Sequence, residues 1–197
     1  PRPARSPELL IDHAWGYETC RMSDIKNYHS EEHSLSNGQV LMRNYSFDEA
    51  LVIVREMTDN LVLDLFEKGL VTSSLTLWIA YDHRYEHEAS KGTVKLERES
   101  NSSKKIIDAV EDLYLRIADR YTGIRRIEVC ANRVAPESYV QYSLFDDPKQ
   151  TDKERHLQEA VLNVKQRYGK NAIMRGSNLL ECSTYRERNE QIGGHRA

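Results

Sequence analysis

The first clear pattern of apolar and polar positions in the chain has the period of an α-helix. Between positions 47 and 65 apolar residues recur every three or four positions, which predicts an amphipathic helix. Ser46 and Glu49 form a capping-box pattern at its start, in which the Ser46 side chain bonds the Glu49 backbone and Glu49 reaches back. Gly69 is suited to the left-handed conformation that ends a helix. A second helix is predicted to start at Ser102-Ser103 and to bury Ile106, Ile107, Val110, Leu113, Tyr114 and Ile117.

Short runs with a period of two predict strands around these helices. The predicted strands cover residues 39–42, 75–81, 93–97 and 127–131. The resulting order is βαββαβ, which predicts an α+β fold of the split-βαβ or ferredoxin-like kind, with both helices on one face of a four-stranded antiparallel sheet. The other face is left uncovered and carries Trp78, Lys95 and Arg126, so we expect it to be a binding surface.

The composition is that of a folded protein in a reducing compartment. The 197 residues are 39% hydrophobic and 30% charged, with a mean hydropathy of −0.69. This length allows one domain of ordinary size plus extensions. No apolar run approaches the length of a membrane span, and the Pro-rich start lacks the apolar stretch of a signal peptide. Cys20, Cys130 and Cys182 are too scattered for a disulfide framework or a zinc cluster, so we expect a cytoplasmic protein.

We divide the chain into three segments. Residues 1–33 are predicted to be a linker or the remnant of a preceding domain, 34–135 the folded domain, and 136–197 a tail. Because the chain lacks an initiator Met, we expect a piece of a longer protein. The tail is predicted to hold a charged helix over about 153–168 and an irregular basic end over 186–197.

The net charge of −3 argues against nucleic-acid binding, but the charge is unevenly distributed. From Lys149 to Ala197 ten Lys and Arg residues stand against six Asp and Glu residues. This positive excess is compatible with a tail that faces DNA.

Two patterns imitate metal sites. His83-Arg84-Tyr85-Glu86-His87 spells the H-x-x-E-H of one metallopeptidase class, which needs both histidines on one helical face. Here the pattern lies between two predicted strands, so a solvated loop is favoured. Tyr45-Ser46-Phe47-Asp48-Glu49 resembles the carboxylate element of certain polymerase palms, but a second carboxylate strand is not recognisable. The capping box explains these residues, and we predict no metal ligand and no catalytic residue.

Two polar stretches are candidates for phosphate binding. Ser34–Gln39 surrounds Gly38 with small polar residues at the entry to a strand, where backbone N–H groups can cradle an anion. Glu97–Lys105 places two serines and two lysines at a helix start, which is a second anion-binding pattern. An ordinary turn explains the first stretch and a well-capped helix start explains the second, and spacing alone favours these ordinary explanations for both.

A docking pattern follows the folded domain. Gln141-Tyr142-Ser143-Leu144-Phe145 combines a Gln that can orient an extended peptide with a Leu-Phe pair that can fill an apolar pocket. Two Asp residues and Pro148 come next, which disfavours a core strand. The pentapeptide resembles the motif by which bacterial DNA polymerases and repair proteins bind the ring-shaped sliding clamp. That resemblance implies Gln141, Leu144 and Phe145 as clamp-binding residues.

Blocks along nearly the whole chain carry a wider resemblance. They are Leu10–Gly16, Asp24–Tyr28, Ser34–Leu41, Glu67–Thr72, Arg126–Val134 and Arg188–His195. These blocks resemble the C-terminal part of bacterial Y-family translesion DNA polymerases, most closely the UV-damage-repair branch. The resemblance implies a thumb remnant, a DNA-binding little finger domain of βαββαβ form, and roles in DNA repair and the SOS response.

The resemblance also implies partners and contact residues. A little finger domain grips the template–primer duplex along its phosphates. The positions implied here are Ser34, Ser36, Asn37, Gly38, Gln39, Thr93, Lys95, Arg98, Ser102, Ser103, Lys104 and Arg126. The palm and fingers of the family are missing from this sequence. We therefore expect the chain to bind DNA and the clamp and to polymerise nothing alone, with Mg²⁺ needed only by the parent polymerase.

Two other functions use a similar fold. A free-standing RRM-like module would bind RNA by stacking bases on aromatic residues of its third strand, but the predicted strand 93–97 has none. A ferredoxin-like regulatory domain would need a paired-domain interface and would leave the docking peptide unexplained.

Overall fold

The computed structural model of this chain describes residues 14–17, 21–26, 34–84, 86–138, 147–192 and 195–196. The chain divides into two compact units, Pro1–Glu32 and His33–Ala197. The described part of the first unit includes the short helix α2 (Met22–Lys26). Along all the described ranges, no helix combines the length and the apolar character that a membrane span requires.

The second unit holds the predicted fold. Its main elements are β1 (Ser34–Tyr45), α3 (Phe47–Glu67), β2 (Leu70–Tyr81), β3 (Ser90–Ser100), α4 (Ser103–Ile117), β4 (Ile124–Asn132) and β5 (Ala135–Pro136). After them come α5 (Pro148–Tyr168), the 3-10 helix η1 (Gly176–Leu179), α6 (Tyr185–Asn189), β6 (Gln191–Ile192) and β7 (His195–Arg196).

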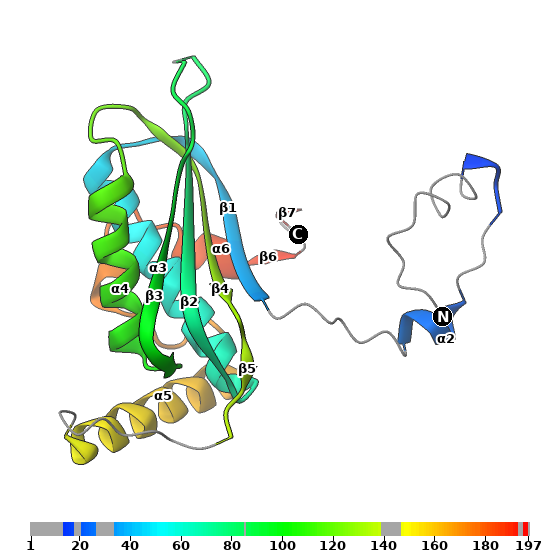
Figure 1. The fold of residues 1–197 in the computed structure, drawn as a ribbon, viewed down its shortest axis with the longest axis vertical. Helices are drawn as coiled ribbons and strands as arrows, with labels where there is room; N and C mark the ends of the chain where they lie inside the picture. Colours follow the sequence, from blue (N-terminus) through cyan, green and yellow to red (C-terminus); the bar gives the residue numbers. More distant parts are fainter. Residues whose placement is uncertain are drawn as a thin grey trace. The chain divides into compact units, whose positions relative to one another are not determined.

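The four long strands form an antiparallel sheet in the order β1-β4-β2-β3, and β5 pairs with the start of β2. Strand β4 lies between β1 and β2, and β2 lies between β3 and β4, so each strand–helix–strand unit encloses one strand of the other. This arrangement confirms the predicted split-βαβ fold of the α+β class. Helices α3 and α4 run along the same face of the sheet (Figure 1).

The core lies between this sheet and the two helices. Its fully buried side chains include Leu41, Ile53, Met57, Leu61, Leu75, Leu77, Ile79, Ile106 and Ile127. Full burial of one such side chain stabilises the fold by about 1.5–3 kcal/mol. The buried Tyr114 hydroxyl satisfies its polarity by donating to the backbone oxygen of Phe47, 2.7 Å away, and thereby joins α4 to the start of α3.

The predicted ends of α3 and the predicted start of α4 are confirmed. The Ser46 backbone N–H donates to Glu49 at 2.9 Å, and the Glu49 N–H donates to the Ser46 hydroxyl at 3.4 Å. Gly69 follows the last helical turn with a φ of 61°, where a side chain would be strained. Ser102 caps α4 by accepting a hydrogen bond from the Lys105 backbone N–H.

The strands are longer than predicted, and one prediction is wrong. Ser34–Gln39 is not a turn, because β1 begins at Ser34 and pairs with β4 from there. The stretch is rich in small polar residues because alternate positions face solvent at a sheet edge. The alternation of apolar and polar residues that indicates a strand is therefore weak before the apolar residues near Val40.

The segment after the sheet also differs from the prediction. Helix α5 begins at Pro148 instead of Lys153, since Asp147 caps it by accepting from the Lys149 N–H and proline fits the first helical turn. The end from Arg186 is not wholly irregular, because α6 covers 185–189. Four described residues of this segment are buried: Gln158, Asn178, Thr184 and Tyr185.

Candidate nucleic-acid interface

The sheet face opposite α3 and α4 is uncovered and is built from rows of paired residues. Strand pairing aligns them across β1, β4, β2 and β3 in that order. The rows are Ser34, Asn132, Ser74 and Lys95; then Ser36, Cys130, Thr76 and Thr93; then Gly38, Glu128, Trp78 and Lys91; then Val40, Arg126 and Ala80. We call these residues the open face.

A ladder of neutral polar side chains crosses the middle of the open face. The Asn132 side-chain amide donates to the Thr76 hydroxyl at 2.9 Å, and the Thr76 and Thr93 hydroxyls lie 2.9 Å apart. The Cys130 thiol donates to Asn132 Oδ1 at 3.3 Å. These contacts hold hydroxyl and amide groups in fixed positions on three neighbouring strands. Groups of this kind contact phosphates and sugars without reading sequence.

Charged residues flank this ladder within one shallow hollow. Its lining joins the ladder residues to Trp78, Lys91, Arg126 and Glu128. The Arg126 guanidinium lies 5.0 Å from the centre of the Trp78 ring, and its Nη2 lies 3.4 Å from Glu128 Oε2. Two cations and neutral donors on an exposed surface can bind a nucleic-acid backbone, and an aromatic ring can stack on an unpaired base.

The predicted DNA-binding residues separate into three groups, with Arg98 apart from them. Six of them lie on the open face: Ser34, Ser36, Gly38, Thr93, Lys95 and Arg126. Asn37 and Gln39 point to the helical side instead, because successive side chains of a strand alternate. The Asn37 amide donates to the backbone oxygen of Met57 at 3.3 Å, and Gln39 accepts from the Thr184 hydroxyl at 3.1 Å. Arg98 is exposed near the end of β3.

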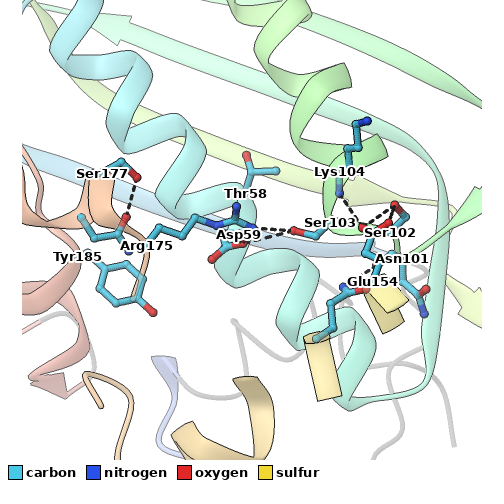
Figure 2. Close-up of polar contacts among 12 residues, drawn as sticks. Thr58, Asp59, Asn101, Ser102, Ser103, Lys104, Glu154, Arg175, Ser177 and Tyr185 are labelled. Atoms are coloured by element: carbon cyan, nitrogen blue, oxygen red, sulfur yellow. Dashed lines mark hydrogen bonds and ion pairs between the residues drawn. The ribbon is translucent and has the colours of Figure 1, made fainter. Parts of the chain in front are cut away.

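The third group lies at the N-terminus of α4, where the chain supplies its own anion. Glu154 of α5 accepts from the Ser102 hydroxyl and from the Lys104 backbone N–H, each at 2.9 Å (Figure 2). The Ser103 hydroxyl accepts from Arg175 at 3.0 Å, and Arg175 also pairs with Asp59 of α3 at 2.7 Å. The N–H groups and hydroxyls that the sequence offered to a phosphate are therefore engaged by the C-terminal segment.

The two imitations of metal sites have structural explanations. His83 and His87 lie in the connection between β2 and β3, where the His87 ring packs against the Tyr81 ring in a tilted arrangement with 4.3 Å between centroids. No group of three or more His, Cys, Asp or Glu side chains that could hold a metal occurs in the described ranges. Glu49 belongs to the capping box, and the hydrogen bond from Arg43 lowers its pKa to about 2.

The docking peptide with Gln141, Leu144 and Phe145 lies outside the described residues. Its flanks are described. Before it, the Glu137 backbone N–H donates to the Gly69 oxygen at 2.8 Å. After it, Arg155 of α5 donates to both carboxylate oxygens of Glu137, at 2.7 and 3.1 Å. The element that follows the peptide is therefore fixed to the residue that precedes it.

Comparison with known proteins places this fold in a family. Residues 32–144 match the impB/mucB/samB family C-terminal domain. The chain belongs to this family. It therefore contains the little finger region of a Y-family DNA polymerase, as its motifs predicted.

Two curated relatives are both DNA polymerase IV 2. The protein of Bacillus subtilis is 25% identical over 164 residues, which are 82% of this chain and 39% of the relative. The protein of Halalkalibacterium halodurans is 21% identical over 168 residues, which are 85% of this chain and 40% of the relative. The chain thus spans about two fifths of the length of these relatives.

Solved structures show weaker likeness. The little finger domain of PolIV, solved in complex with the beta-clamp processivity factor, has a TM-score of 0.41 and 12% identity and covers 58% of this chain and 100% of that chain. A chimera of the Y-family polymerases Dbh and Dpo4 has a TM-score of 0.40 and 16% identity, with 66% and 35% covered.

Several residues of the open face were missed by sequence reasoning. The alternation pattern assigns only Trp78, Lys95 and Arg126 to this face. The residues that line the hollow but were not assigned are Thr76, Lys91, Glu128, Cys130 and Asn132. A signal existed in β4, where Glu128, Cys130 and Asn132 alternate with buried apolar residues after Arg126. The pairing of Thr76 with Thr93 depends on strand register, which periodicity does not fix.

Proposed function

We propose that this little finger region binds the template–primer duplex of a translesion DNA polymerase through its open face, without reading sequence. The observation that carries the proposal is the uncovered sheet face itself, in which Lys91, Lys95 and Arg126 surround a fixed ladder of hydroxyl and amide groups. Its side chains can neutralise phosphates and donate hydrogen bonds to their oxygens. These contacts hold any duplex equally well, which suits a polymerase that must stay on damaged template.

The N-terminus of α4 does not contribute to this proposed grip. Glu154 occupies its donors, and Arg175 ties Ser103 to Asp59 on the helical side of the sheet. We therefore assign the duplex to the open face and to the neighbouring Arg98, and we leave out Asn37, Gln39 and Ser102–Lys104.

A second part of the proposal concerns the sliding clamp. Gln141, Leu144 and Phe145 resemble a clamp-binding motif, and the family membership of the chain supports such a role. The flanks of the peptide are joined by the Arg155–Glu137 ion pair, so a clamp bound there stays close to the DNA-binding domain. Together the two contacts would keep a polymerase on its template, with catalysis by Mg²⁺-binding palm residues of the parent protein.

The test is titration of the chain with fluorescent primer–template duplex at several salt concentrations. We expect weak binding that is independent of sequence. The slope of log K against log salt should be flatter in Lys95→Ala/Arg98→Ala, by roughly 0.9 for each phosphate that the variant no longer neutralises. Lys149→Ala/Lys153→Ala, at two exposed positions of α5, changes the net charge by the same amount and serves as the control. Binding that depended on base sequence and ignored salt would contradict the proposal, and stronger binding of single-stranded RNA would favour the RRM-like alternative.

A further inference from the structure

Glu128 is a carboxylate in the middle of a surface that we assign to a polyanion. Strand pairing places it opposite Gly38 of β1 and Trp78 of β2. A Cβ atom at Gly38 would lie 3.6 Å from Glu128 Cγ, so the side chain leans over the space that the glycine leaves. The described residues that line the hollow of the open face include this one carboxylate and two cations, Lys91 and Arg126.

Arg126 is the cation that Glu128 contacts. Its Nη2 lies 3.4 Å from Glu128 Oε2, and its guanidinium lies over the Trp78 ring at 5.0 Å. The two side chains are 49% and 37% exposed. An ion pair this exposed is weak, so a phosphate group can replace the carboxylate as the partner of Arg126.

We infer that Glu128 sets the affinity of the open face for duplex DNA by holding Arg126 against Trp78. The inference rests on the proposed function of that face. Binding of a phosphate to Arg126 must break the contact with Glu128, so one anion is exchanged for another. The contact between Arg126 and a phosphate therefore contributes less binding free energy than it would if Glu128 were absent. A grip weakened in this way lets the domain move along the duplex instead of fixing it at one site.

The experiment measures duplex affinity against salt for Glu128→Gln, Arg126→Ala and the double variant. Glu159→Gln changes the net charge by the same amount outside the open face. Because an Arg126 released from Glu128 adds a full phosphate contact, Glu128→Gln should bind more tightly than the wild-type chain, with a slope steeper by about 0.9. Its advantage should fall by roughly threefold when the salt concentration rises about fourfold. In the Arg126→Ala background the same substitution should change little.

Three results would count against the inference or its basis. Equal binding by Glu128→Gln and Glu159→Gln would remove the role of Glu128 while leaving the open face as the DNA site. An equal gain in the presence and absence of Arg126 would show that Glu128 repels phosphate directly, and would overturn the role of the ion pair. If the wild-type chain shows no salt-dependent duplex binding, the proposed function itself fails.

Discussion

Glu154 of α5 binds the N-terminus of α4 through the Ser102 hydroxyl and the Lys104 backbone N–H, fifty residues earlier in the chain. A carboxylate is favourable there because the N-terminal N–H groups of a helix carry partial positive charge. Close by, Gln158 donates to the Asn101 backbone oxygen at 3.1 Å. The charged helix α5 is thus joined to the folded domain by specific polar contacts.

Glu154→Ala should loosen α5 from the domain. Hydrogen bonds to a charged group contribute about 1.5–3 kcal/mol. The substitution removes the carboxylate that accepts these bonds from Ser102 and Lys104 of the α4 N-terminus. We expect faster amide exchange along α5 and an unchanged exchange rate in the central strands β2 and β4. Glu159→Ala, five residues further along the same helix, should leave α5 protected. Equal protection in both variants would show that the other contacts of α5, such as those of Arg155 and Gln158, hold the helix without Glu154.

Gly92 permits the close approach of β3 to α4. A Cβ atom there would lie 2.8 Å from Leu113 Cδ1 and 3.1 Å from Ile117 Cγ2. Gly92→Ala should therefore destabilise the fold by about 1–3 kcal/mol, because a packed core resists added volume. The matched control is Gly38→Ala on the open face, where the nearest atom would lie 3.6 Å away. Urea unfolding of the two variants should show a lower midpoint only for Gly92→Ala.

The elements of the core could be predicted because helix caps and apolar periodicity act locally. Ser46, Glu49 and Gly69 specify the ends of α3, and each lies within two residues of the end that it specifies. The site was predicted only in part, because it depends on contacts between distant segments. Nothing in the sequence indicates that Glu154 contacts Ser102 or that Arg175 contacts Ser103. The sequence pattern at Ser102 and Ser103 therefore predicts an anion site that is open to ligands. Strand β1 was underestimated because its polar edge residues resemble a turn.

The stability of the domain should depend on pH through Glu56. This residue of α3 is buried, its carboxylate accepts from the Thr184 backbone N–H at 3.3 Å, and it faces Arg188. Burial raises its pKa above the ordinary value of 4.5, and the hydrogen bond from the Ser183 side chain and the charge of Arg188 only partly oppose this. The pKa of Glu56 is thus higher in the folded state than in the unfolded state. Its contribution to the free energy of unfolding is therefore complete below pH about 4.5 and is lost as pH rises through the folded pKa.

Glu56→Gln keeps an acceptor for Thr184 and removes the buried charge. Its free energy of unfolding relative to the wild-type chain should therefore increase as pH rises from about 4 toward neutrality. Urea unfolding at several pH values gives this difference directly, and exposed Glu159→Gln is the control whose difference should stay flat. A constant difference for Glu56→Gln would mean that Ser183, Arg188 and Thr184 together fully compensate the burial of the carboxylate.

The clamp-binding peptide gives the sharpest prediction. Leu144 and Phe145 should insert into an apolar pocket of a sliding clamp, each contributing about 1.5–3 kcal/mol by burial, with Gln141 fixing the direction of the strand. Ordering the peptide offsets part of this gain, so we expect a dissociation constant near the micromolar scale, about −8 kcal/mol. Leu144→Ala/Phe145→Ala should lose nearly all clamp affinity in a surface-binding assay. The same variant should unfold at the same urea concentration and bind duplex DNA as before, because positions 144 and 145 follow the last strand of the βαββαβ domain in the sequence. A variant that unfolds would show that they belong to the core, and one that folds and still binds the clamp would place the contact elsewhere in the chain.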